Sequence, residues 1–271
     1  MSKENWNKLL SDEFNQQVDD WAESRNALIG DTTFPYGVGN VLMPWGPPRE
    51  KGPTSHYGLF NELVTKDLIR HFCDAIGDKN PLYRFDEYAR NTRWGGIIAP
   101  NGILICIGEA GTGRGRVAPG FGRSLAGGST WTWYKVIRPG DTFHVMGTDL
   151  GVKEKKPHRE VPYRLFISTY RTTYMNQRNE IVATRDRTRV HIVAETRQET
   201  ETAFEYRERY RYTQEELDRI HQGYCDEELN RRGARTRFWE DVVEGEEIFP
   251  VVAGPLTVLD CHCMMGAMGQ Q

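Results

Sequence analysis

The chain has 271 residues, of which 38% are hydrophobic, 11% aromatic and 27% charged, and its formal net charge at pH 7 is -3. At about 100–200 residues per domain, this length allows one or two domains. The composition excludes a membrane-embedded protein and argues against a disordered one. Because positive and negative charges nearly balance, the chain offers no broad field to hold a polyanion. We therefore expect a globular protein with neither nucleic acid nor a membrane as its partner.

The N-terminal residues, the apolar runs and the cysteines together indicate the cellular compartment of the protein. The first residues, MSKENWNKLLSDEFNQQ, are polar and contain no apolar stretch of the kind found in signal peptides. The longest strongly apolar run, Ile103–Ile107, is far below the roughly 20 residues that a membrane-spanning helix needs. Five scattered cysteines, an odd number, do not suggest a disulfide framework. These features predict a cytoplasmic protein.

The N-terminal region contains one helical pattern followed by a Gly- and Pro-rich stretch. Apolar side chains recur at helical spacing over Asp12–Leu28, and Trp21 is the largest of them. Residues 30–53 then contain too many glycines and prolines for a continuous element. We interpret residues 1–57 as an extension that packs on the main domain.

The next helix is predicted over Thr65–Gly77. Thr65 is a natural N-cap, and Gly77 is a natural end. Its apolar stripe is predicted to consist of Leu68, Ile69, Phe72 and Ile76. Turn residues follow at 78–81, and a short second helix is predicted over Asp86–Thr92.

A buried helix and four strands are predicted after these helices. Ile103–Ala110 is apolar all round at its start, which is typical of an enclosed helix. A glycine-rich loop is predicted over residues 111–128. Strands are predicted over Ser129–Ile137, Thr142–Lys153, Pro162–Tyr174 and Glu180–Val193, with a hairpin at Asn176–Asn179 between the last two. A buried helix followed by antiparallel strands indicates an α+β domain.

The C-terminal part changes in character. Charged residues dominate 196–237, which we interpret as a linker. It contains a polar helix predicted over Gln214–Arg232, and this helix ends at Gly233. In residues 238–271, VVEGEEIFPVV is predicted to be a strand and LTVLDCHCMMGAMG the start of a helix.

Several of these segments resemble one family. VTKDLIRHFCDAIGDKNPLYRFDEYARNTRWGGIIAPNG, GGSTWTWYKVIRPGDTF and residues 180–193 are similar to the MaoC-like dehydratases, which include the (R)-specific enoyl-CoA hydratases of hot-dog fold. The resemblance implies a hot dog over residues 58–195, a curved antiparallel sheet around a central helix that includes Ile103–Ala110. RFWEDVVEGEEIFPVVAGPLTVLD resembles the opening of a second hot dog, which would be incomplete within residues 238–271.

The family's chemistry is hydration of an enoyl thioester, which needs a base for the water and an acid for the α-carbon. The resemblance implies an Asp and a His in a GDxNPLH loop, where this chain has Asp78, Asn80 and, at the His position, Tyr83. An unperturbed tyrosine has a pKa of about 10 against about 6.5 for histidine, so it is a poor base near neutral pH. It can still donate a hydrogen bond or act as a general acid. The alternative is that Asp78 and Asn80 only cap the turn between two helices.

Binding residues are also implied by the resemblance. Backbone N–H groups at Asn101 and Gly102 would face the thioester oxygen, although a simple chain bend explains this glycine equally well. Arg114, Arg116 and Arg123 are candidates for contacts with CoA phosphates. The sequence Cys261-His262-Cys263 does not match zinc-site spacing, so we expect no metal. Coenzyme A, as part of the substrate, is the only cofactor-like group expected.

The sequence thus predicts a MaoC-like hydratase or dehydratase component that catalyses reversible hydration of a trans-2-enoyl-CoA. Because the first hot dog has no His in its loop, we expect the chain to be the acyl-binding half, with the catalytic pair supplied by another hot-dog chain in a homo- or hetero-oligomer or by sequence outside these residues. The alternative is a non-catalytic hot-dog subunit or binding module that stabilises a catalytic partner. The sequence does not specify the acyl group.

Overall fold

The computed structural model describes residues 9–33, 61–108, 118–156, 161–196, 208, 210–230 and 237–268. The chain forms two compact units that interleave along the sequence. The first consists of Met1–Val64 and Leu104–Phe204, and the second of Thr65–Ile103 and Glu205–Gln271.

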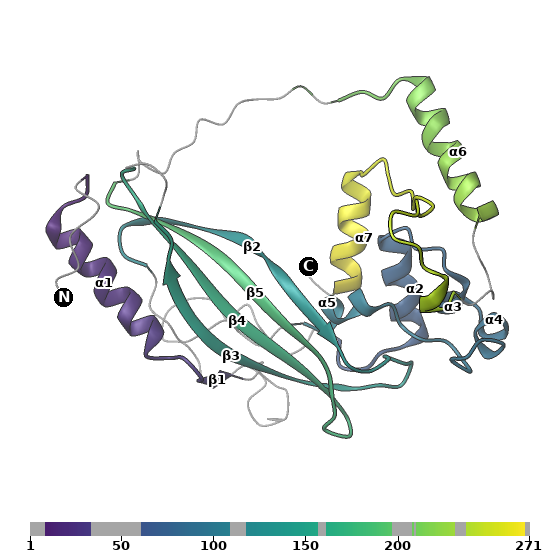
Figure 1. Cartoon of the computed structure of the whole chain (residues 1–271), viewed down its shortest axis with the longest axis horizontal. Coiled ribbons are helices and arrows are strands. Elements are labelled where there is room, and N and C mark those ends of the chain that lie inside the picture. Colours follow the sequence, from purple (N-terminus) through teal and green to yellow (C-terminus); the bar gives the residue numbers. More distant parts are fainter. Residues whose placement is uncertain are drawn as a thin grey trace. The chain divides into compact units, whose positions relative to one another are not determined.

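The first unit is built on an antiparallel sheet (Figure 1). Its strands are ordered β1-β3-β4-β5-β2 across the sheet, and every neighbouring pair is antiparallel. Their bounds are β1 Thr32–Thr33, β2 Phe121–Trp133, β3 Phe143–Glu154, β4 Arg164–Asn176 and β5 Ile181–Ala194. The predicted hairpin joins β4 to β5, with Asn179 at a positive φ of 57°. The antiparallel sheet and its helices confirm the predicted α+β class and hot-dog fold.

Strand β2 begins eight residues earlier than predicted. We expected a glycine-rich loop up to Gly128, but Phe121 already pairs with Ala194 and the pairing with β5 continues to Trp133. The irregularity between Ala126 and Gly128 takes up the two glycines as a bulge, so they do not end the strand. The prediction was therefore wrong for residues 121–128, and also for residues 134–137, because the strand ends at Trp133.

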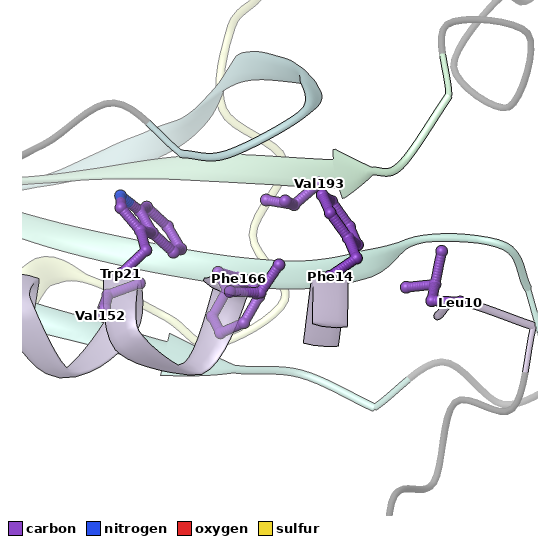
Figure 2. Packing of buried hydrophobic residues seen from close by; sticks show 7 residues of the cluster. Leu10, Phe14, Trp21, Val152, Phe166 and Val193 are labelled. Carbon is purple, nitrogen blue, oxygen red and sulfur yellow. The ribbon is translucent and has the colours of Figure 1, made fainter. Parts of the chain in front are cut away.

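Helix α1, Asp12–Asn26, confirms the N-terminal helical prediction and packs on the sheet. Ser11 caps it, because its hydroxyl accepts a hydrogen bond from the Phe14 N–H at 3.2 Å. Figure 2 shows the apolar side of the helix meeting side chains of β3, β4 and β5. The buried cluster comprises Leu10, Phe14, Val18, Trp21, Val152, Phe166 and Val193. The described part of the N-terminal extension is thus part of the hydrophobic core.

A buried arginine ties α1 to the sheet beside this cluster. The Arg164 guanidinium on β4 donates to Glu154 at 2.7 Å, to Asp19 at 2.6 Å and to the carbonyl of Asn15 at 3.0 Å. Two of these partners lie on α1, so the guanidinium fixes the helix along the strands as well as satisfying its own charge.

The predicted central helix is present but short. α5 spans Leu104–Ile107, and Leu104, Cys106 and Ile107 are fully buried. The Tyr174 hydroxyl on β4 donates to the carbonyl of Gly108 at 3.0 Å, which joins the helix end to the sheet. Residues 109–117, including the rest of the predicted helix, lie outside the described residues.

The second unit is helical in its described part. Its elements are α2 Lys66–Ala75, α3 Pro81–Arg84, α4 Asp86–Arg90, the 3-10 turn η1 Asn101–Ile103, α6 Gln214–Asn230, the 3-10 turn η2 Trp239–Asp241 and α7 Val258–Met268. The Thr65 hydroxyl caps α2 by accepting from the Leu68 N–H at 2.9 Å, as predicted. Three of the four predicted stripe residues are buried, but Ile76 is 41% exposed because it follows the end of the helix. Helix α3 was not predicted separately from the turn that it follows.

The C-terminal strand prediction was wrong. Residues 242–257 contain no strand, and α7 follows them and packs against α2. The backbone in this stretch bonds to side chains of α6, since Glu227 accepts from the Val252 N–H at 3.1 Å and the Tyr224 hydroxyl donates to the Gly254 carbonyl at 2.8 Å. The predicted helix end at Gly233 lies outside the described residues. No helix in the described part of the chain combines the length and apolarity needed to cross a membrane.

Candidate functional site

The loop after α2 holds the predicted acid and its neighbours in a tight turn. Gly77 leaves the helix at a φ of +71°, which favours glycine. The Asp78 carboxylate then accepts a hydrogen bond from the Asn80 N–H at 2.8 Å. The Asn80 side chain accepts from the Leu82 N–H at 3.0 Å and caps α3. Both side chains therefore perform the turn-capping roles that we weighed against catalysis.

Arg84 fixes the backbone of the same loop. Its guanidinium donates to the Asp78 carbonyl from Nε at 2.9 Å and from a terminal nitrogen at 2.7 Å. It also pairs with the Asp74 carboxylate at 2.7 Å. The Asp78 residue is thus held in place by its backbone and is half-buried. The Arg84 guanidinium bonds the Asp78 carbonyl and not the Asp78 carboxylate.

Tyr83, at the position of the family's His, lies in the electrostatic neighbourhood of this carboxylate. Burial, and then the charge of Asp78 and the thiol of Cys73, raise the pKa of Tyr83 above its ordinary value. Burial is likewise the main cause that raises the pKa of Cys73 to about 12. Near pH 7 both groups stay protonated, so the loop contains one carboxylate and a neutral phenol. The phenol can donate a hydrogen bond but does not act as a base.

Gly102 lies where a side chain would meet the core of the second unit. A Cβ added at this position would lie 3.0 Å from the Cζ atom of Phe72, which is only 2% exposed. This contact supplies a packing reason for glycine in η1. Asn101 is exposed beside it. The thioester-binding role of these two residues stays a prediction.

The remaining predicted residues are placed as follows. Arg114 and Arg116 lie outside the described residues, and Arg123 is exposed on β2 in the first unit. Cys261 and Cys263 are exposed on α7. In the described ranges, no three His, Cys, Asp or Glu side chains gather closely enough to hold a metal ion.

A cavity that we did not predict from the sequence lies in the first unit. It has a volume of about 340 Å³ and is lined by side chains of α1, β2, β4 and β5. Its polar lining includes Arg25, Arg123, Ser168, Arg187, Arg189 and His191. The signal was present in RDRTRVH, residues 185–191, because alternate residues of a strand share one face.

The comparisons with known proteins agree with the family seen in the motifs. Residues 53–185 match the FAS1-like dehydratase domain region. A probable enoyl-CoA hydratase alpha subunit from Thermomonospora curvata is 30% identical over 141 residues, which cover 45% of this chain and 42% of the relative. A UPF0336 protein from Thermobifida fusca is 31% identical over 94 residues, which cover 33% of this chain and 62% of the relative. The chain thus matches less than two thirds of the length of either relative.

Among solved structures, a MaoC-like dehydratase from Rhodospirillum rubrum is similar with a TM-score of 0.38 and 22% identity, covering 61% of this chain and 92% of that one. The matched dehydratase region contains the Asp78 loop, α5 and most of the sheet. The antiparallel sheet of the first unit is that of a hot-dog fold, and the matched region is that of dehydratases. Over residues 53–185 the chain is therefore similar to the MaoC-like hot-dog dehydratases.

Proposed function

We propose that this chain is the acyl-binding subunit of a MaoC-like hydratase or dehydratase that acts reversibly on a trans-2-enoyl-CoA thioester. The observation that carries the proposal is Tyr83: the family's basic position holds a phenol whose pKa is raised by burial and by Asp78. Hydration needs a group that takes a proton from water near neutral pH. Since the loop keeps the carboxylate but has no imidazole, we infer that the catalytic base comes from a second hot-dog chain.

One curated relative supports a multi-subunit enzyme. The Thermomonospora curvata relative is named as an alpha subunit, a name that implies at least one other chain. The proposed role of this chain is to bind the acyl thioester, through the backbone at Asn101 and Gly102, while the partner supplies the Asp and His pair. The reaction requires no cofactor beyond the CoA portion of the substrate. The five cysteines form no disulfide, which suits a cytoplasmic enzyme.

The test is a hydration assay of the chain alone and with a co-expressed hot-dog chain that has an intact GDxNPxH loop. We expect the chain alone to be inactive on a trans-2-enoyl-CoA and the pair to be active. In the pair, Asp78→Asn should change turnover by less than about threefold, because the carboxamide still accepts from the Asn80 N–H. Asp86→Asn, which alters an exposed carboxylate of the same region, is the matched control.

Two outcomes would contradict the proposal. Turnover by the isolated chain would show that it contains its own base. A loss of a hundredfold or more in the assembled Asp78→Asn enzyme, with unchanged melting temperature and assembly, would make Asp78 a catalytic residue. In that case Tyr83→His should raise the activity, because an imidazole takes a proton near neutral pH where a phenol does not.

A non-catalytic hot-dog subunit is the second candidate, and one observation favours it. The Asp78 and Asn80 side chains are both engaged in capping the turn, as they would be in a purely structural loop. Direct binding of a non-hydrolysable acyl-CoA analogue to the isolated chain separates the two candidates. Binding supports the acyl-binding subunit, and absence of binding by a chain that still activates its partner supports the structural one.

A further inference from the structure

The cavity of the first unit lies between α1 and three strands of the sheet. Trp21 and Arg25 come from α1, and Ser168 from β4. Arg187, Arg189 and His191 come from β5. Pairing of β4 with β5 places Ser168 opposite Arg189 and Phe166 opposite His191, so these four side chains share the face of the sheet that α1 covers. A volume of about 340 Å³ falls at the lower end of the range for small-molecule sites.

The lining of the cavity is strongly basic. The described residues that line it include four arginines and no carboxylate. The charge of Arg25 is balanced by the buried Asp149, whose carboxylate lies 2.9 Å away and does not line the cavity. Among the described residues, the Nε atom of Arg189 is buried and has no hydrogen-bond partner. A buried guanidinium donor without an acceptor is unfavourable, so an anion in the cavity would complete the site.

His191 adds a hydrogen bond to the lining. Its Nε2 atom lies 2.8 Å from the Ser168 hydroxyl, and the Trp21 ring packs edge-on against the imidazole with centroids 5.7 Å apart. Burial, and then the charges of Arg25 and Arg189, lower the pKa of His191. The imidazole is therefore neutral near pH 7. The hydrogen bond with the His191 ring therefore orients the Ser168 hydroxyl.

We propose that this cavity binds a phosphate group of a small ligand. Guanidinium groups present forked donors that match phosphate oxygens, and several of them around one cavity suit a doubly charged group better than a single carboxylate. The phosphate comes either from a free inorganic ion or from the nucleotide portion of a coenzyme. The proposal does not depend on the proposed hydratase role, because it rests on the cavity alone.

The test is calorimetric titration of the full chain with inorganic pyrophosphate and, separately, with adenosine 3′,5′-bisphosphate. We expect the wild-type chain to bind at least one of them. Arg189→Met, which keeps an unbranched apolar side chain but removes the guanidinium donors, should weaken binding about tenfold to a hundredfold. Arg185→Met is the matched control: Arg185 lies on the same strand but stacks on Trp131 at 5.0 Å and does not line the cavity. The Arg185→Met chain should bind both ligands with the affinity of the wild-type chain.

The two ligands distinguish the sources of the phosphate. Adenosine 3′,5′-bisphosphate binding at least tenfold tighter than pyrophosphate would indicate a nucleotide, and comparable or weaker binding a free phosphate. If Arg189→Met fails to fold, Arg187→Met provides the same test from the neighbouring position on that face. No binding of either ligand by the wild-type chain, or equal binding by the wild-type, Arg189→Met and Arg185→Met chains, would overturn the proposal. The hydration assay described above is read independently of these results.

Discussion

Gly102 offers a direct test of whether the start of η1 is shaped by packing or by a ligand. The Cβ of a new side chain there would lie 3.0 Å from Phe72 Cζ, against the 3.5–4.0 Å at which carbon atoms pack best. Phe72 is 2% exposed, so its ring is enclosed in the core. Gly102→Val adds two further methyl groups at this contact. Overpacking of this kind costs about 1–3 kcal/mol.

The size of the effect follows from this contact. At about 2–4 °C per kcal/mol for a protein of this size, the melting temperature of Gly102→Val should fall by roughly 2–12 °C. Phe72→Leu removes the ring atom that the new Cβ meets. The double variant should therefore lose less than the sum of the two single variants, with a coupling of about 1 kcal/mol. Gly96→Val is the matched control, because a Cβ at Gly96 meets nothing within 4 Å.

Thermal unfolding and binding of an acyl-CoA analogue are measured on the same four variants. If Gly102→Val melts like Gly96→Val, the contact with Phe72 does not govern this glycine and the packing argument is refuted. If Gly102→Val loses binding, and the double variant with Phe72→Leu recovers the melting temperature but not the affinity, the backbone at Gly102 binds the thioester. If the double variant recovers both properties, the glycine is explained by packing.

Two further predictions concern the first unit. Trp21→Ala should destabilise the chain by about 3–5 kcal/mol, measured by denaturant unfolding, because Trp21 is 5% exposed and packs edge-on against Phe166 at 5.2 Å; a change below 1 kcal/mol would mean that α1 does not pack as described. His191→Gln should make stability less sensitive to acid: the lowered pKa of His191 means that the unfolded chain binds more protons below about pH 6.5, so wild-type stability falls as the pH drops from there toward the folded-state pKa. Melting temperatures at pH 7.5 and 5.5 check this, and an equal drop in both chains would contradict it.

The elements that local sequence determines were predicted closely. α1 and α2 begin at hydroxyl caps, Ser11 and Thr65, that each accept a hydrogen bond from the third residue after them. β3, β4 and β5 were found within about two residues of their ends, since a turn bounds each of them and the side chains alternate between faces. The chain itself supplies these signals within a few residues.

The elements that depend on a distant partner were not predicted. Glycines at 127 and 128 are unfavourable in a strand, and only pairing with β5 holds the first half of β2 in place. The run from Val242 to Val252 is rich in β-branched residues, but it pairs with no described strand, and the Val252 N–H at its end bonds to the Glu227 side chain of α6. Propensity is a weak guide where the partner decides the conformation.

The two candidate sites differ in the same way. The Asp78 loop was visible in the sequence because its residues are contiguous, and the structure adds that burial keeps Tyr83 protonated. The basic cavity was missed because alternating arginines on a strand usually indicate a solvated face. In this chain α1, from more than 150 residues earlier, covers that face, and the Arg189 Nε atom is buried with no hydrogen-bond partner among the described residues. A row of charges on one face of a strand is therefore a candidate site wherever another element of the chain covers it.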